Sequence, residues 1–315
     1  MAVVPKLSLA AVGWALVYLA VWAGSVAVLS SAPGGVGEEA ISIGVIFGVA
    51  APLLAWLLTA FGKGRRTPVP VARPAVETVA VVAYMVVYAL LFLGWGLSAV
   101  REWFPEDPQR ELAISAVKIL AHIVLPAGLL LFLGARIGPL FRAHAGRLTF
   151  WLPLVVLGAA MLALLMIISP SLKRINELNL TSEAWLWAGP GTFLWLLLTV
   201  GLCEEFLFRA VLQSRLTAFL KSATGAVVIG SLLFGLAHAP GLYLRAEPGE
   251  FGAFQNPLFV VAYTVAVLSP TGIFFGVLWQ RTQSLWLLAL LHVSIDFLPN
   301  LPRFVQSYGS LFTGG

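Results

Sequence analysis

The chain has 315 residues, of which 60% are hydrophobic and only 10% are charged, and its mean hydropathy is +0.94. Soluble domains carry about 25% charged residues, so the composition excludes an ordinary soluble protein and indicates one helical membrane domain. The net charge of +5 comes from short connections between apolar segments rather than from a basic stripe, so nucleic-acid binding is not expected. Cys203 is the only cysteine, which excludes intrachain disulfides and a cysteine-based zinc site.

Apolar stretches long enough to cross about 30 Å of hydrocarbon as helices recur along the whole chain. The first is longer than a signal-peptide core and is therefore counted as a span. The segments fall at about 7–30, 41–61, 76–99, 113–134, 149–169, 187–213, 224–244, 257–279 and 284–302. We predict an all-α fold, a polytopic transmembrane bundle of about eight to nine helices in a lipid bilayer.

The basic residues of alternate connections differ in number between the two sides of the predicted bundle. One side holds Lys6, Lys63, Arg65, Arg66, Arg73, Arg136, Arg142, Arg147, Arg209, Arg215, Lys221 and Arg281, which are twelve. The other side holds Arg101, Arg110, Lys173, Arg174, Arg245 and Arg303, which are six. The positive-inside rule then places the N-terminus in the cytoplasm and, with nine spans, the C-terminus outside.

Two adjacent carboxylates interrupt the sixth segment. Glu204 and Glu205 differ by about 100° around a helix, so they face different directions. Arg209 follows Glu205 by four residues and is expected to pair with it through a charge-assisted hydrogen bond. A buried Glu–Arg pair that merely locks two helices would explain Glu205 but not Glu204. Glu204, without an obvious partner, is our candidate general base.

Two later segments add further ionisable groups. His238 ends the sequence Phe-Gly-Leu-Ala-His, and His292 and Asp296 are four residues apart, so they share one face of the last helix. Any one of these residues could serve packing alone, but the set on three neighbouring apolar helices indicates a site. With the limits above, Glu204 lies toward one end of its span and His238 toward the opposite end of the next.

Small residues predict that these helices pack closely: Ser231 and Gly235 before His238, and Gly272 and Gly276 before the last span. Lys118 and His122 share a helical face in the fourth segment and are interpreted as packing in the bundle interior, with substrate contact as the alternative.

The ordered set Glu-Glu-x-x-x-Arg at 204–209, Phe-x-x-x-His at 234–238 and His-x-x-x-Asp at 292–296 resembles the motifs of the CAAX protease and bacteriocin-processing family, also called the Abi or type II CAAX prenyl endopeptidase family. The resemblance covers about residues 190–300. It implies a helical core with an intramembrane catalytic cavity that opens to the cytosol. We accordingly divide the chain into accessory helices (1–180), a catalytic core (181–304) and a short tail (305–315).

The resemblance also implies roles for the motif residues. Glu204 would be the base and His238 would hold or activate a water molecule. His292 and Asp296 would lie at the oxyanion, with Glu205 and Arg209 in support. Many relatives have Asn where this chain has Asp296, and an ionised Asp cannot donate a hydrogen bond to an oxyanion, so Asp296 is either protonated or orients His292.

A metal is a separate question. Glu204, His238 and His292 could supply the His₂Glu ligands of a catalytic zinc site or hold another divalent metal. The family has been described both as metalloproteases and as glutamate proteases, and the residue types do not decide between them.

The leading hypothesis is an intramembrane endopeptidase that cleaves a peptide or membrane-anchored protein near the membrane surface. Its composition, rich in Ala, Leu and Gly, favours a bacterial cytoplasmic membrane, where a leader or signalling peptide is a better substrate than a prenylated one. One alternative is a catalytically inactive immunity or scaffold protein. Another is a proton-coupled transporter, although paired repeats are not found.

Overall fold

The structure, a computed structural model, describes residues 8–32, 36–60, 68–144, 146–245, 252 and 254–313. Within these ranges every regular element is a helix, and nine helical stretches are long and apolar enough to cross a membrane. The predicted all-α, polytopic bundle is thereby confirmed.

The first five spans consist of α1 (Leu9–Ser30); α2, η1 and α3 (Gly37–Val45, Ile46–Ala50, Ala51–Ala60); α4, η2 and α5 (Pro74–Val87, Tyr88–Gly96, Leu97–Trp103); α6, η3 and α7 (Gln109–Ile119, Leu120–Val124, Leu125–Phe132); and α8 (Leu148–Ile168). The last four consist of α10, η5, α11, η6 and α12 (Ser182–Leu196, Leu197–Gly201, Leu202–Glu205, Phe206–Gln213, Ser214–Leu220); α13 and α14 (Ala223–Ala237, Ala239–Arg245); α15, η7 and α16 (Pro257–Tyr263, Thr264–Leu268, Ser269–Thr282); and α17 (Leu285–Tyr308). Short helices η4 (Gly138–Phe141), α9 (Ser171–Glu177) and α18 (Ser310–Thr313) lie outside the spans.

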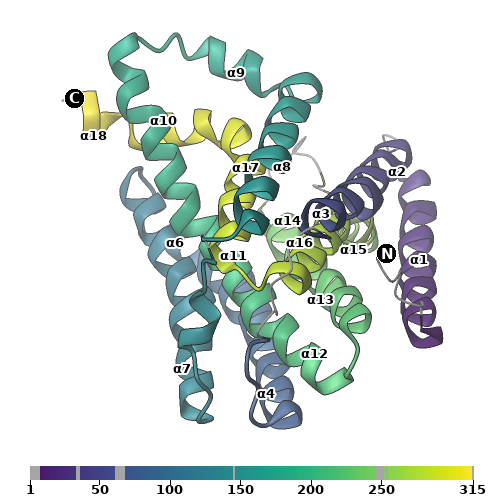
Figure 1. Cartoon of the computed structure of the whole chain (residues 1–315). Helices are drawn as coiled ribbons and strands as arrows, with labels where there is room; N and C mark the ends of the chain where they lie inside the picture. The colour runs from purple at the N-terminus through teal and green to yellow at the C-terminus, as the bar shows by residue number, and fades with distance from the viewer. Residues whose placement is uncertain are drawn as a thin grey trace.

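Successive spans alternate in direction, and the helices that carry the sequence motifs lie in the middle of the bundle. Figure 1 shows α1 and α2 on one side of α11, α13, α16 and α17, and α6 and α7 on the other. The first span is fastened to the eighth, because the Trp22 indole donates to the Ala266 carbonyl at 2.9 Å and the Tyr18 and Ser269 hydroxyls lie 3.0 Å apart.

The sixth span is longer than its apolar pattern indicates. It runs as one helical stretch from Ser182 to Leu220, whereas the sequence predicts an end near 213. The polar residues beyond 213 are tolerated because their side chains have partners inside the bundle; Arg215, for example, pairs with Glu77 at 3.2 Å. The helix ends at Lys221, whose φ of 51° is left-handed, and Ser222 then caps α13 by accepting from the Gly225 amide at 3.0 Å.

The burial of two arginines changes the charge count behind the predicted topology. Arg209 and Arg215 lie inside the bundle with acidic partners, so neither belongs to a surface connection. Removing them from the twelve leaves ten against six, which still favours a cytoplasmic N-terminus. Lys6, Lys63, Arg65 and Arg66 lie outside the described residues.

Close helix contacts confirm the prediction from the small residues. A Cβ at Gly272 would lie 2.8 Å from the Ser231 Cα, so α16 and α13 touch through their backbones. Gly201 makes a similar approach, because its Cβ would lie 2.6 Å from the Ala289 carbonyl oxygen of α17. The Gly201 contact brings the sixth and last spans, which both carry motif residues, within side-chain reach of each other.

The Glu77–Arg215 pair ties α4 to α12, and neither side chain is exposed. We expect Glu77→Gln to destabilise the fold by about 3–5 kcal/mol, since it leaves a buried guanidinium without its counter-charge. Thermal unfolding in detergent measures this. Lys173→Met is the matched control, because it breaks only the exposed pair with Glu177, and such pairs contribute little. Equally small shifts in both variants would contradict the structural importance of the buried pair.

Candidate active site

The hairpin between α12 and α13 places Glu204 and His238 at the same depth. Glu204 stands 17 residues before Lys221 and His238 stands 17 residues after it. Because both arms are helical and rise at about the same rate, the two side chains meet. The mismatch in depth that the sequence predicted arose from ending the sixth span near 213.

The acid–base residues predicted from the three motifs converge. Glu204 Oε2 lies 4.0 Å from His238 Nε2 and 3.9 Å from His292 Nε2. Asp296 Oδ2 lies 3.5 Å from the same nitrogen of His292. Glu204 and His292 are largely buried, whereas Asp296 and His238 are more accessible. The spacing between Glu204 and each histidine suits a water molecule that contacts both.

Glu205 and Arg209 lie behind His292. Glu205 Oε1 accepts from His292 Nδ1 at 2.7 Å, and Phe275 stacks on the imidazole with ring centroids 4.9 Å apart. Glu205 rather than Asp296 therefore holds the orientation of His292 through Nδ1, while Asp296 approaches Nε2.

The predicted Glu205–Arg209 interaction forms as an ion pair, at 3.2 Å, but not as a hydrogen bond. The Glu205 and Arg209 side chains are both buried. Arg209 lies in the π-helical segment η6, whose geometry differs from that of the α-helix on which the predicted four-residue pairing was based. The guanidinium carbon lies over the Phe234 ring, 4.3 Å from its centroid, so cation–π contact contributes to holding the charge.

In both histidines, the hydrogen bond that Nδ1 makes determines whether Nε2, which faces Glu204, donates or accepts a hydrogen bond. His238 Nδ1 lies 2.8 Å from the Phe234 carbonyl, which can only accept, so the proton is on Nδ1 and a neutral His238 presents Nε2 as an acceptor. The same reasoning applies to a neutral His292, whose Nδ1 donates to Glu205. The Nε2 atoms that face Glu204 are then acceptors. A water molecule could donate one hydrogen bond to such a nitrogen and the other to the Glu204 carboxylate.

The two Nε2 atoms also have the chemistry of metal ligands. Histidines that bind a metal usually donate the N–H of their other ring nitrogen to a carboxylate or carbonyl, as His292 and His238 do here. Their spacing does not suit one. Tetrahedral ligands at about 2.0 Å from zinc stand about 3.3 Å apart, closer than the distances to Glu204 here. In the described part of the chain, no group of three or more His, Cys, Asp or Glu residues is arranged to hold a metal ion.

A cavity of about 490 Å³ extends from Glu204 and His238 toward one end of the bundle, and its lining does not include His292 or Asp296. The first half of the chain forms one of its walls, with Tyr88, Arg101, Lys118 and His122. His122 Nδ1 donates to the Lys118 carbonyl at 2.8 Å, so its Nε2 accepts from the Tyr88 hydroxyl, also at 2.8 Å. Lys118 and His122 thus line the same cavity as Glu204.

Sequence reasoning missed other residues of this cavity. Tyr88 resembles any other aromatic residue of a membrane helix, so nothing in the sequence singles it out. Arg245 is counted only as a topological charge, yet its guanidinium donates to the carbonyls of Leu93 and Gly94 and joins α14 to η2. An unusual density of ionisable groups near span ends is the one signal that could have indicated this wall.

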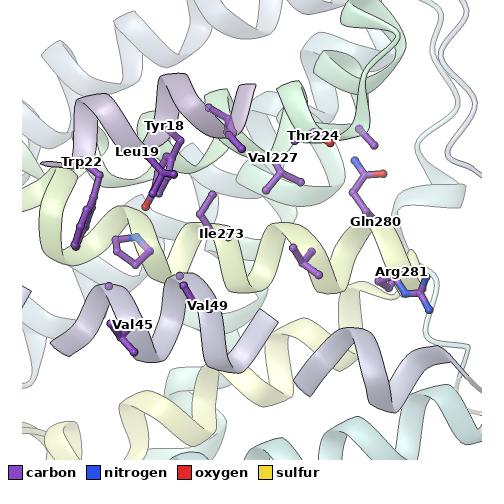
Figure 2. Close-up of a pocket in the computed structure, with 17 residues that line it drawn as sticks. Tyr18, Leu19, Trp22, Val45, Val49, Thr224, Val227, Ile273, Gln280 and Arg281 are labelled. Carbon is purple, nitrogen blue, oxygen red and sulfur yellow. The ribbon is translucent and has the colours of Figure 1, made fainter. Parts of the chain in front are cut away.

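A second pocket, of about 500 Å³, lies among α1, α2, α13 and α16. Figure 2 shows its apolar surface, formed by side chains such as Leu19, Val45, Val227 and Ile273. Its lining includes no Asp, Glu, His or Cys, whereas the cavity at Glu204 is lined by Glu111, His122, Glu204 and His238.

The cavity opens near the ends of α5, α14 and α17, where Arg101 and Arg303 are exposed. Because the spans alternate in direction, this end lies across the bundle from Leu9, where α1 begins. A cytoplasmic N-terminus and a cytosolic cavity mouth, both expected from the sequence, are therefore incompatible with nine spans.

Comparison with known proteins agrees with the motif resemblance. Residues 185–298, about a third of the chain, match the family described as type II CAAX prenyl endopeptidase Rce1-like. No curated protein and no solved structure matches this chain. The matched segment contains Glu204, Glu205, Arg209, His238, His292 and Asp296. Residues 185–298 are thus similar to the type II CAAX prenyl endopeptidase family, within a chain whose described residues form nine helical stretches long and apolar enough to cross a membrane.

Proposed function

We propose that the protein is an active intramembrane endopeptidase in which Glu204 and His238 activate water. The observation that carries this proposal is the position of the Glu204 carboxylate, which lines the cavity together with His238 and lies 4.0 Å from His238 Nε2 and 3.9 Å from His292 Nε2. These are the groups and separations that general acid–base hydrolysis requires.

The reaction begins with water held between Glu204 Oε2 and His238 Nε2. Glu204 takes a proton as the water oxygen attacks the peptide carbonyl carbon, and the carbonyl π electrons move to its oxygen. The oxyanion then re-forms the carbonyl as Glu204 gives its proton to the amide nitrogen and the C–N bond breaks, which yields an amine and a carboxylic acid; the acid releases the second water proton to solvent and becomes a carboxylate. No step passes through a metal.

The tetrahedral oxyanion needs hydrogen-bond donors. A protonated His292 would donate to Glu205 from Nδ1 and to the oxyanion from Nε2. Asp296, 3.5 Å from Nε2, could donate only if protonated and otherwise acts by positioning His292.

The first test is peptide cleavage by the protein purified in lipid nanodiscs, read by mass spectrometry on a library of hydrophobic, lipid-anchored peptides. We expect wild type to cleave, and Glu204→Gln and His238→Ala to lose about 10²- to 10⁴-fold in rate. Glu177→Gln and His144→Ala are matched controls outside the cavity and should keep wild-type rates. A folded wild type that cleaves nothing would instead support the inactive scaffold.

Chelator in the same assay addresses the metal. The water mechanism predicts unchanged cleavage after chelation and dialysis. Loss of cleavage that zinc restores would favour ligation by Glu204, His238 and His292 over a free Glu204 base.

The cavity mouth lies, in this proposal, on the outer side of the membrane. The support is the count of basic residues in the alternate connections of the sequence, ten against six after the buried arginines are removed. Substrates would then reach Glu204 from outside the cell or from the outer leaflet.

Sidedness is tested with single cysteines in a Cys203→Ala background. Glu106→Cys lies in the connection beside the cavity mouth and Arg136→Cys at the other end of the bundle, and both positions are exposed. In intact cells we expect a membrane-impermeant maleimide to label position 106 and to reach 136 only after permeabilisation. The reverse pattern would place the mouth in the cytoplasm.

A further inference from the structure

The lining of the cavity has an excess of positive charge. Arg101, Lys118, Arg245 and Arg303 line the cavity, against the two carboxylates of Glu111 and Glu204. Since an ionisable group at membrane depth is costly, each of these charges requires a partner or a function.

Two of the four cations are used within the fold. Arg303 pairs with Glu111 at 2.7 Å. Arg245 donates to the backbone carbonyls that join α14 to η2. Among the residues that the structure describes, the side chains of Arg101 and Lys118 make neither an ion pair nor a hydrogen bond.

Lys118 is the deeper of these two. It is half-buried in the fourth span, one turn before His122, whereas Arg101 is exposed at the mouth. The helices that carry them pack together through a small cluster of Leu97, Val100 and Ile114. The two cations therefore belong to one wall, one near the mouth and one further in.

The depth of Lys118 relative to Glu204 follows from neighbouring contacts. The fourth and sixth spans run in the same direction, and the Trp195 indole donates to the Ser115 hydroxyl at 3.3 Å. Lys118, three residues after Ser115, is thus level with about Thr199, and Glu204 lies about 7 Å deeper along the axis. An extended peptide covers that distance in about two residues.

We propose that Lys118, with Arg101 at the mouth, binds a carboxylate of the substrate peptide about two residues from the bond that is cleaved. The carboxylate comes from an acidic side chain or from a free C-terminus, which present the same chemistry to an ammonium group. This selectivity rests on the proposed peptidase function but is measurable without cleavage.

The test uses Lys118→Met, which removes the charge and keeps an unbranched chain, and Lys118→Arg, which restores a charge. Lys173→Met on α9 is the matched control, since it removes an exposed lysine outside the cavity. Each is combined with Glu204→Gln, so that peptides can be retained without being cleaved. The probes are lipid-anchored peptides in Asp/Asn pairs and in C-terminal acid/amide pairs.

We expect nanodisc-bound protein to retain the acidic member of at least one type of pair about 10- to 100-fold more strongly than the neutral member. Lys118→Met should abolish the preference without weakening retention of neutral peptides, and Lys118→Arg should keep most of it. Which type of pair shows the preference identifies the source of the carboxylate.

Equal retention of acidic and neutral peptides, or a preference that persists in Lys118→Met, would overturn the proposal. If the preference depends on Lys118 but protein with an intact Glu204 cleaves no peptide, the carboxylate site stands and the peptidase proposal fails. Cleavage without any preference for acidic peptides would support the peptidase proposal and overturn the carboxylate site.

Discussion

The contact between Glu205 and His292 joins the sixth span to the last and fixes the geometry on which the other site residues depend. It is possible because Gly201, one turn before Glu205, lets the backbone of α17 approach at Ala289. With Nδ1 committed to Glu205, His292 directs Nε2 toward Glu204 and Asp296. A side chain at position 201 would separate the two helices and would therefore move Glu204 away from His292.

Ionisable groups inside this bundle are largely arranged as pairs. Glu77 with Arg215, Glu205 with Arg209, and Glu111 with Arg303 each join elements or turns whose positions matter for the cavity. Such pairs contribute specificity of packing more than net stability, because desolvation offsets much of their attraction. Lys118 differs from these groups because its side chain makes no ion pair or hydrogen bond within the described residues, which is why we propose a ligand for it.

Much of the architecture and the set of motif residues could be predicted from the sequence, since apolar length and charged interruptions are local signals. The limit of the sixth span could not, because Arg215 looks like a surface residue until Glu77, distant in sequence, is seen beside it. The same holds for Tyr88, whose place opposite Glu204 depends on how the third and fourth spans pack. The end of the bundle at which the cavity opens could not be predicted either, because it depends on the direction of every span.

Because the third and fourth spans form part of the cavity wall, a minimal fragment of this protein that keeps the cavity has to include them. A fragment limited to residues 185–298 would keep the motif residues but lose Tyr88, Lys118 and His122, and it would leave Arg215 without Glu77. Its reactive carboxylate would face lipid rather than a shaped enclosure. Grafting or trimming this core therefore has to begin no later than Pro74, where the helix that encloses the site starts.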